Sequence, residues 1–507
     1  MPPQASACGI GGKMREYIAA LDQGTTSSRA LLFDRAGRSV ASAQEEFPQI
    51  YPNPGWVEHD PRAILSSQFG ALRAVLKKAG VSAEQLAAVG VANQRETVFL
   101  WDRFTGKPVY NAIVWQCRRT SAFCEQLART HGEWIYERTG LRVDAYFSAS
   151  KLKWMLDNVP FARERAERGE LLFGTADTYL IWNLTGGKVH ATDRTNASRT
   201  MLFNIHTLQW DEELCKLFGI PMCVLPEVRP SGAAFGKTER TLFGAEIPVC
   251  AAVGDQQGAL FGHLCVEEGT GKTTYGTGCF LLVNTGERAV RSRNGLITTL
   301  TASLAKPQYA LEGSVFVGGA AVQWLRDGLG LVSSAKETEE IAKSVPDTGG
   351  VSFVPAFVGL GAPHWDAECR GTIAGITRGT TRAHIVRAAL ESIALQVFDV
   401  VHAMEQDLRA EIARLCVDGG ASANDFLMQF QADILGAEVV RPACAETTAR
   451  GAAYLAGLYT GFYKDIGFLR GQAAEADVFF PQMEAAARAA KLLAWEEALA
   501  RAMYRRA

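Results

Sequence analysis

Short apolar runs alternate with segments of helical spacing along most of the chain. Strands are predicted at the apolar runs 18–21, 30–33, 88–92, 98–101, 249–253, 279–283, 351–354 and 415–417. Helices are predicted where apolar residues recur with the helical period, at 61–79, 256–264, 318–328, 383–407 and 484–503. Strand and helix patterns that alternate in this way indicate an α/β fold with antiparallel hairpins.

The turn between the first two predicted strands is rich in groups that bind phosphate. It runs from Asp22 to Arg29 and carries one carboxylate, one glycine, four hydroxyls and one arginine. The N–H groups and hydroxyls of a tight turn can surround phosphate oxygens, and Arg29 can add positive charge. Asp22 can hold Mg²⁺ directly or through water. A polar hairpin turn without a ligand has the same residue types, so the turn alone leaves both interpretations open.

A similar turn recurs in the second half of the chain. Gly276-Thr277 again precedes an apolar strand, 252 residues after Gly24-Thr25 in a chain of 507 residues. A duplicated fold would produce this spacing, and each half would then present a Gly-Thr turn to one nucleotide in a cleft between two domains. We therefore expect one domain over 14–264 and another over 265–507, preceded by a disordered extension over 1–13.

Composition narrows the class of protein. Apolar residues make up 48% and charged residues 21% of the chain, as in ordinary soluble globular proteins of more than one domain. The net charge of −2 excludes a global positive field that would draw the protein to nucleic acid or a membrane surface. Neither a membrane-length apolar run nor a signal-peptide core is present. The 11 cysteines include no Cys-x-x-Cys pair, so we expect reduced thiols in a cytoplasmic protein without a structural zinc site.

The run Gly269-Thr270-Gly271-Lys272-Thr273-Thr274 looks like the end of a P-loop. The P-loop pattern requires a further glycine at the position that Val266 occupies, and it continues into a helix. Here the run continues into Tyr-Gly-Thr, so we do not expect a P-loop.

Asp255 directly follows the predicted strand 249–253 and Gly254. A carboxylate held at a strand end inside a cleft can accept a proton from a substrate hydroxyl. The same sequence also fits an aspartate that caps the helix predicted over 256–264. Capping is the more common role of Asp before a helix, so the motif alone favours it.

Two other strand ends carry polar motifs with more than one interpretation. Arg95-Glu96 can bind neighbouring hydroxyls through its N–H donors and carboxylate oxygens, but an isolated pair is more often a surface ion pair. After the strand 415–417, Gly419-Gly420 could let a base or ribose lie against the backbone, with Asn424 as a hydrogen-bond partner. A tight strand-to-helix turn explains the paired glycines equally well.

Taken together, these stretches resemble the FGGY carbohydrate kinases over about 17–503. One signature of that family is matched by 146–158 and the other by 371–376 with its continuation to His384 and Glu391. Further blocks are most similar to the members of the family that phosphorylate glycerol; they are 22–29, 93–97, 111–119, 196–205, 359–366 and 424–433.

The resemblance implies two actin-like, ribonuclease-H-like domains with ATP and Mg²⁺ in the interdomain cleft, and glycerol as substrate. It implies Asp255 as the general base, and Asp22 and Asp255 near the metal. The residues implied to bind substrate are Arg95, Glu96, Trp115, Tyr146, Asp255, Gln256 and Phe280. The residues implied to bind the nucleotide are Asp22, Thr25, Thr26, Ser27, Arg29, Thr277, Gly319, Gln323, Gly420 and Asn424. We expect a homodimer or homotetramer that binds neither nucleic acid nor membrane.

The chain departs from the family pattern in two places. Residues 235–244 lack the Gly-Gly-x-Gly-Gly loop with arginine that binds fructose 1,6-bisphosphate in enterobacterial relatives. They also lack the histidine that is phosphorylated in some Gram-positive relatives. Ser148-Ala149-Ser150 replaces the usual Ser-Gly-Thr. We therefore expect neither form of control.

Two alternative functions remain at this point. The first is an FGGY kinase for a longer polyol or a ketose, which the Arg95-Glu96 pair and the aromatic residues Trp115 and Phe280 disfavour because they shorten the pocket. The second is a non-catalytic actin-like nucleotide switch or filament subunit, which the fold alone permits. A complete set of hydroxyl-binding residues beside Asp255 argues against it.

Overall fold

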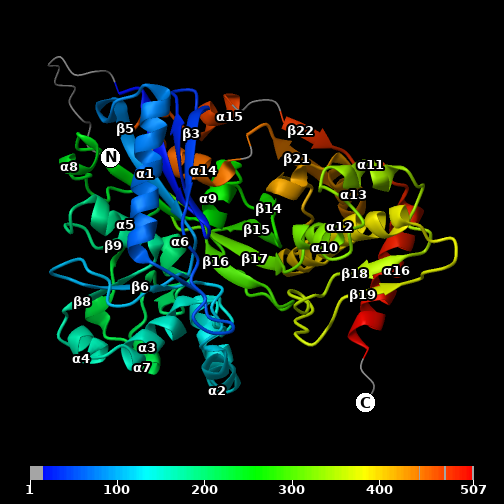
Figure 1. Cartoon of the computed structure of the whole chain (residues 1–507), viewed down its shortest axis with the longest axis horizontal. Helices are drawn as coiled ribbons and strands as arrows, with labels where there is room; N and C mark the ends of the chain where they lie inside the picture. Colours follow the sequence, from blue (N-terminus) through cyan, green and yellow to red (C-terminus); the bar gives the residue numbers. More distant parts are fainter. Residues whose placement is uncertain (1–14, 445, 473–475, 505–507) are drawn as a thin grey trace.

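The computed structural model describes residues 15–444, 446–472 and 476–504 and contains two large sheets (Figure 1). The predicted extension over 1–13 lies outside the described residues. The first sheet has the order β13-β5-β1-β2-β3, with β1 Tyr17–Gln23, β2 Ser27–Phe33, β3 Ser39–Glu46, β5 Leu86–Asn93 and β13 Val249–Gly254. The strands β1, β2 and β3 are antiparallel, whereas β1, β5 and β13 are parallel.

The second sheet repeats this pattern. Its order is β16-β17-β15-β14-β20-β21-β22, with β14 Gly271–Tyr275, β15 Cys279–Gly286, β16 Ile297–Leu300, β17 Tyr309–Val315, β20 Arg414–Asp418, β21 Glu438–Pro442 and β22 Ala476–Phe479. The strands β14, β15 and β17 are antiparallel, whereas β14, β20 and β21 are parallel. The duplication predicted from the two Gly-Thr turns is thus confirmed, and the chain is a two-domain α/β protein.

The two Gly-Thr turns occupy equivalent places in the two sheets. The N–H of Gly24 donates to the carbonyl of Ser27 at 3.0 Å in the β1–β2 turn. The N–H of Gly276 donates to the carbonyl of Gly278 at 2.9 Å in the β14–β15 turn. A backbone hydrogen bond therefore closes each hairpin at its Gly-Thr turn.

Helices cover both sheets. Helix α1 (Pro61–Ala79) packs on β2 and β3, with Asp60 as its N-cap and Gly80 ending it in the left-handed conformation. Helix α12 (Arg382–Leu408) packs on β15 and β17 of the second sheet. Other helices of the second half are α10 Gly319–Asp327, α11 Glu337–Lys343, α13 Asp425–Leu435 and α16 Ala485–Met503. The predicted helix 256–264 is α9 (Asp255–Gly262).

Helix α14 (Thr447–Tyr459) returns to the first sheet after the second sheet has been built. It packs against β5, β13 and α9 with small residues, and the approach is close. A Cβ added at Gly451 would lie 1.8 Å from the carbonyl oxygen of Gly258 in α9. The short helix α15 (Ile466–Gly471) contributes Leu469 to the same core. The domain boundary near 264 remains a prediction. It separates the strands of the two sheets, but not the helices, because α14 and α15 follow it in sequence and pack on the first sheet.

The segment between β5 and β13 makes up more than half of the first half of the chain and carries its own helices and short strands. Its helices are α2 Ser121–Thr139, α3 Ser148–Asn158, α4 Ala162–Glu167, α5 Ala176–Leu184, α6 Arg194–Ala197, α7 Glu212–Phe218 and α8 Arg240–Phe243. Its short strands, with β4 from just before α1, form two-stranded ladders of β4 Glu58–His59 with β7 Ala112–Ile113, β6 Phe99–Asp102 with β8 Leu171–Gly174, β9 Ala191–Asp193 with β12 Glu227–Arg229, and β10 Phe203–Asn204 with β11 Gln209–Trp210. In the second half, β18 Ser352–Val354 pairs with β19 Thr372–Ala374.

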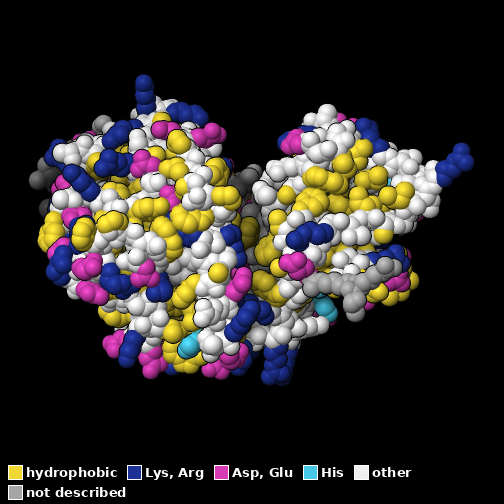
Figure 2. Space-filling view, turned by 60° about the horizontal axis from the view of Figure 1, so that its bottom comes forward, with side chains coloured by type: hydrophobic (Ala, Val, Ile, Leu, Met, Phe, Trp, Pro, Cys, Tyr) yellow, Lys and Arg dark blue, Asp and Glu magenta, His cyan; other side chains and the backbone are white. Residues whose placement is uncertain are grey.

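Each predicted strand and helix is present among the described residues. The Gly271–Lys272 run is strand β14, which confirms that it is not a P-loop. No helix of the described ranges is both long and apolar enough to cross a membrane. The surface is hollowed between two lobes (Figure 2).

Candidate active site

Three parallel strands of the first sheet end at the same edge and bring the candidate residues together. The register pairs Asp22 of β1 with Ala92 of β5, and Gly254 of β13 with Asn93 of β5. The residues that follow these strand ends are therefore neighbours. The Nε of Arg95 lies 3.2 Å from Oδ1 of Asp255.

Arg95 and Glu96 are buried, with 2% and 1% of their surfaces exposed, so the interpretation as a surface ion pair is wrong. The two Nη atoms of Arg95 donate to the two carboxylate oxygens of Glu312, at 2.8 Å each. Nη1 also donates to Oε1 of Gln257 at 3.2 Å, and Nη2 lies 3.5 Å from the hydroxyl of Tyr146. The guanidinium is thus held by the protein on most of its edges.

Glu96 adopts the left-handed conformation, with φ of 62°, directly after the strand end. Its Oε1 accepts a hydrogen bond from Nε of Arg199 at 2.6 Å and lies 3.7 Å from Nε of Arg95. Burial raises the pKa of Glu96, although Arg199 and Arg95 oppose the shift. The carboxylate is therefore oriented by two arginines and not by solvent.

Two members of this charge network escaped the sequence analysis. Glu312 lies in β17 and Arg199 follows α6, and both are buried. The Nη atoms of Arg199 donate to Glu312 at 3.0 and 3.2 Å. Although burial would raise the pKa of Glu312, Arg199 and Arg95 hold it well below its usual range. The available signal was a glutamate in the middle of an otherwise apolar, buried strand.

Asp255 is the first residue of α9, and Gly254 occupies the N-cap position without a side-chain bond, so the capping interpretation is wrong. The carboxylate accepts the N–H of Gln256 at 2.7 Å and has 33% of its side-chain surface exposed. Burial raises its pKa, and Arg95 opposes that shift. Asp255 is therefore a partly desolvated carboxylate that a ligand can reach.

Asp22 lies near Asp255 at the same sheet edge. Burial raises the pKa of Asp22 to about 7; Arg29 lowers it, while Asp255 and Glu446 raise it further. The two carboxyl groups therefore lie close enough for the charge of Asp255 to act on Asp22. Such a pair fits a divalent cation that takes one or two carboxylates and completes its shell with phosphate and water. Within the described ranges no group of three or more His, Cys, Asp or Glu side chains could hold a metal ion.

Lys272, in the run that resembled a P-loop, is fully buried behind the site. Its Nζ donates to Oε1 of Gln256 and, at 2.7 Å, to Oγ1 of Thr274. Burial lowers the pKa of Lys272, whereas Asp418 and Asp255 raise it. The lysine therefore orients Gln256 and faces the carboxylates from inside the protein.

The β1–β2 turn and the aromatic residues are in contact. The indole Nε1 of Trp115 donates to Oγ1 of Thr25 at 3.0 Å, and its ring meets that of Tyr146 edge to face with centroids 5.6 Å apart. Thr26 is exposed. Ser27 is buried and accepts from Gln44 at 2.9 Å.

Arg29 leaves the turn to pair with Glu446, with Nη1 and Oε2 3.0 Å apart. Helix α14 begins one residue after Glu446. This pair therefore links the first turn to the segment that returns from the second half.

The candidate residues of the second half gather at the ends of β14 and β20, which are parallel neighbours. Thr277 is exposed, and its carbonyl accepts the N–H groups of Gly318 at 2.8 Å and Ala320 at 3.1 Å at the start of α10. The N–H of Gly319 donates to the carbonyl of Gly276 at 2.8 Å. Gln323 is exposed on α10, and Phe280 is half-buried in β15.

The turn after β20 has a structural explanation of its own. Gly419 has a φ of 88°, and a Cβ there would lie 2.6 Å from the carbonyl oxygen of Tyr275. Gly420 is exposed, with no atom near a Cβ added to it. Asn424 caps α13 by accepting the N–H of Leu427 at 2.9 Å, and it donates to Thr338 at 3.2 Å. The tight turn therefore requires glycine at position 419, but it does not require glycine at position 420.

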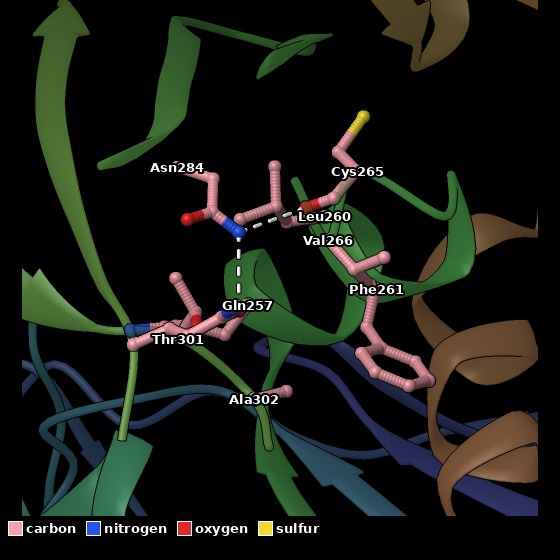
Figure 3. Close-up of a pocket in the computed structure, with 9 residues that line it drawn as sticks. Gln257, Leu260, Phe261, Cys265, Val266, Asn284, Thr301 and Ala302 are labelled. Carbon is pink, nitrogen blue, oxygen red and sulfur yellow. Dashed lines mark hydrogen bonds between the residues drawn. The ribbon is translucent and has the colours of Figure 1, made fainter. Parts of the chain in front are cut away.

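A cavity behind Gln257 is not the site (Figure 3). It lies between α9 and β15, and Asn284 donates across it to the carbonyl of Cys265 and to Oε1 of Gln308, at 3.3 Å each. Side chains leave no room in it for a water molecule.

The sequence matches the models of two family domains. Residues 17–262 match the N-terminal domain and residues 271–459 the C-terminal domain of the FGGY family of carbohydrate kinases. The chain is 59% identical over 491 residues to the glycerol kinase of Pseudothermotoga lettingae, covering 96% of this chain and 98% of that relative. It is 58% identical over 490 residues to glycerol kinase 2 of Thermotoga maritima, covering 96% and 99%.

Solved structures show the same similarity. The crystal structure of Plasmodium falciparum glycerol kinase with ADP matches with a TM-score of 0.92 at 38% identity, over 97% of this chain and 99% of that one. The gluconate kinase from Lactobacillus acidophilus matches with a TM-score of 0.85 at 23% identity, over 96% and 98% of the two chains. At that identity the second likeness concerns the fold alone.

Proposed function

This chain belongs to the FGGY family of carbohydrate kinases, and from that premise we propose that it transfers the γ-phosphate of ATP to a terminal hydroxyl of glycerol, giving sn-glycerol 3-phosphate. The observation that carries the proposal is the contact of Asp255 with Arg95 at 3.2 Å, beside Asp22, where three strands end. A reachable, partly desolvated carboxylate is suited to take a proton from a hydroxyl.

Specificity for a three-carbon polyol would come from saturating its hydroxyls. A site whose polar groups stay unpaired with the wrong ligand discriminates strongly against that ligand. Arg95, Glu96, Tyr146 and Gln256 would bind the hydroxyls, in support of which Arg95, Glu96 and Tyr146 lie in one buried network. Trp115 would cover one side of the carbon chain and Phe280 the other.

Asp255 would accept the proton of the attacking hydroxyl while its oxygen bonds to the γ-phosphorus and ADP leaves. Burial raises the pKa of this carboxylate, which favours proton acceptance, and Arg95 opposes that rise. In phosphoryl transfer most of the acceleration comes from positioning and electrostatics. The hydrogen bonds that hold Arg95 in place support a role of this residue in positioning and in electrostatics.

Asp22 and Asp255 would hold Mg²⁺ that enters with ATP. When bound, Mg²⁺ supplies positive charge to the phosphate oxygens. The phosphates would be bound by hydroxyls, N–H groups and positive charge of the two turns. The residues are Thr25, Thr26, Ser27 and Arg29 in the first turn and Thr277 in the second. Gly319, Gln323, Gly420 and Asn424 would meet the nucleoside, and exposed Gln323 and Gly420 are available for it.

A coupled assay of ADP release tests the proposal with glycerol, dihydroxyacetone, erythritol and xylulose as acceptors. We expect the highest kcat/KM with glycerol. A higher kcat/KM with erythritol or xylulose would instead identify a kinase for a longer polyol or ketose. ADP release that no acceptor stimulates would favour the nucleotide switch. Light scattering would decide between the predicted homodimer and homotetramer.

A further inference from the structure

Two charged residues, Glu312 and Arg199, are fully enclosed beside the proposed substrate residues but have no role in the reaction described above. Glu312 is 1% exposed and Arg199 is 0% exposed. Glu312 belongs to β17 in the second sheet, whereas Arg199 and Arg95 belong to the first half of the chain. The network that they form therefore ties the two halves together directly under the site.

Glu312 fixes the orientation of the guanidinium of Arg95. It binds both Nη atoms at 2.8 Å, which is the bidentate geometry that leaves an arginine no freedom to rotate. The remaining edge, formed by Nε and Nη2, then faces Oδ1 of Asp255 at 3.2 Å and the hydroxyl of Tyr146 at 3.5 Å. That edge is the part of Arg95 that can meet a substrate hydroxyl.

Arg199 does the same for Glu96. Its Nε binds Oε1 of Glu96 at 2.6 Å, while its Nη atoms bind Glu312. The guanidinium also lies over the rings of Phe147 and Tyr146, 5.1 and 5.7 Å from their centroids. Arg199 thus sets the relative positions of Glu96 and Tyr146, both proposed to bind substrate.

Stability does not explain this network. Removing two carboxylates and two guanidinium groups from water carries a large desolvation cost, and apolar residues of similar volume often stabilise a core as well or better. The two negative and two positive charges cancel, which reduces the desolvation cost. What the network provides beyond stability is a fixed orientation of its side chains. Glu312 and Arg199 are not proposed to touch substrate, but each binds a residue that is: Glu312 binds Arg95, and Arg199 binds Glu96.

We propose that Glu312 and Arg199 are positioning residues of the proposed glycerol site, which orient Arg95 and Glu96 without touching substrate. This inference rests on the proposed function. Under this inference, the selectivity of the site for glycerol also depends on Glu312 in β17 and on Arg199 after α6. The inference predicts that losing the clamp weakens glycerol recognition while nucleotide binding, at the two turns, is retained.

The test is steady-state kinetics of Glu312→Gln, in which the amide keeps the size but cannot accept from both Nη atoms of Arg95. We expect the KM for glycerol to rise at least about tenfold, with the KM for ATP within about twofold of wild type. Glu391→Gln is the matched control. Glu391 is also a buried carboxylate held by two cations, Arg387 at 2.9 Å and Lys491 at 2.7 Å, but it lies on α12 outside the site. We expect it to lower the melting temperature without changing the glycerol KM.

Glu312→Asp provides a second variant if Glu312→Gln does not fold. Aspartate keeps the charge but is one methylene shorter and cannot reach both Nη atoms, so the same selective rise in glycerol KM is expected. An unchanged glycerol KM, an equal rise of both KM values, or failure of both variants to fold would overturn the inference. A wild-type protein without glycerol-dependent ADP release would overturn the proposed function itself, which the inference requires.

Discussion

Replacing Asp255 by Asn removes the proposed base but keeps the size of the side chain and its hydrogen bond to the backbone. Asparagine has the same volume, and its Oδ1 can still accept the N–H of Gln256 that Asp255 binds at 2.7 Å. Because Gly254 is the N-cap of α9, the substitution removes no cap. The ion pair with Arg95 is lost, but Arg95 keeps its two hydrogen bonds to Glu312 at 2.8 Å, so its buried charge stays paired and the fold should be retained.

The catalytic effect should be much larger than the structural one. A positioned general base contributes about 10²–10⁴-fold, so kcat of Asp255→Asn should fall by that factor, or about 2.7–5.5 kcal/mol in the activation free energy. The glycerol-dependent ADP release would be measured beside the melting temperature. Asp157→Asn is a suitable control because Asp157 is 37% exposed and pairs with Lys153 at 2.9 Å near the C-terminal end of α3. A kcat of at least a third of wild type in Asp255→Asn would refute the assignment of the base.

Three further predictions concern specificity, control and pH. Glu96→Gln weakens a buried charge-assisted contact, so kcat/KM for glycerol should fall roughly 10- to 150-fold with little change in ATP affinity, and an unchanged kcat/KM would count against the pocket. Fructose 1,6-bisphosphate should not inhibit, because 235–244 lack the binding motif; saturable inhibition in a titration would reveal another site. Despite burial, Asp418 raises the pKa of His263 above 6.5, so this ion pair should stabilise the fold fully below that pH and progressively less as pH rises through the folded pKa. The difference in melting temperature between wild type and His263→Gln should accordingly shrink towards alkaline pH.

Local patterns were enough to predict the frame of the site. Asp22, Arg95 and Asp255 each follow an apolar run, and the parallel order of β1, β5 and β13 places the ends of those runs at one edge. The likeness of the two Gly-Thr turns similarly anticipated the duplicated sheets. In both cases the signal lies within a few consecutive residues, so that no knowledge of the tertiary structure is needed to find it.

The partners of these residues could not be predicted in the same way. Arg95 and Glu312 are 217 positions apart, and only the folding of β17 beside the first half brings them together. Pattern also misjudged burial: Arg95-Glu96 has the composition of a surface pair, and its enclosure depends on Tyr146, Gln257 and Glu312. Helix α14 consists largely of small and apolar residues and is buried over most of its length, but its sequence does not show which of the two sheets it packs on.

The duplicated fold also explains how one architecture can provide two different surfaces for a nucleotide and its acceptor. In the first hairpin the register pairs Asp22 with Arg29; at the corresponding place in the second hairpin it pairs Thr274 with Phe280. A carboxylate and a guanidinium in one half thus correspond to a hydroxyl and an aromatic ring in the other. Under the proposed function, the charged turn would serve the cation and phosphates, while the ring would cover carbon. The two hairpins have the same backbone pattern, so the difference between them lies in their side chains. The buried contacts of Glu312 with Arg95 and Arg199 connect the two halves behind these surfaces.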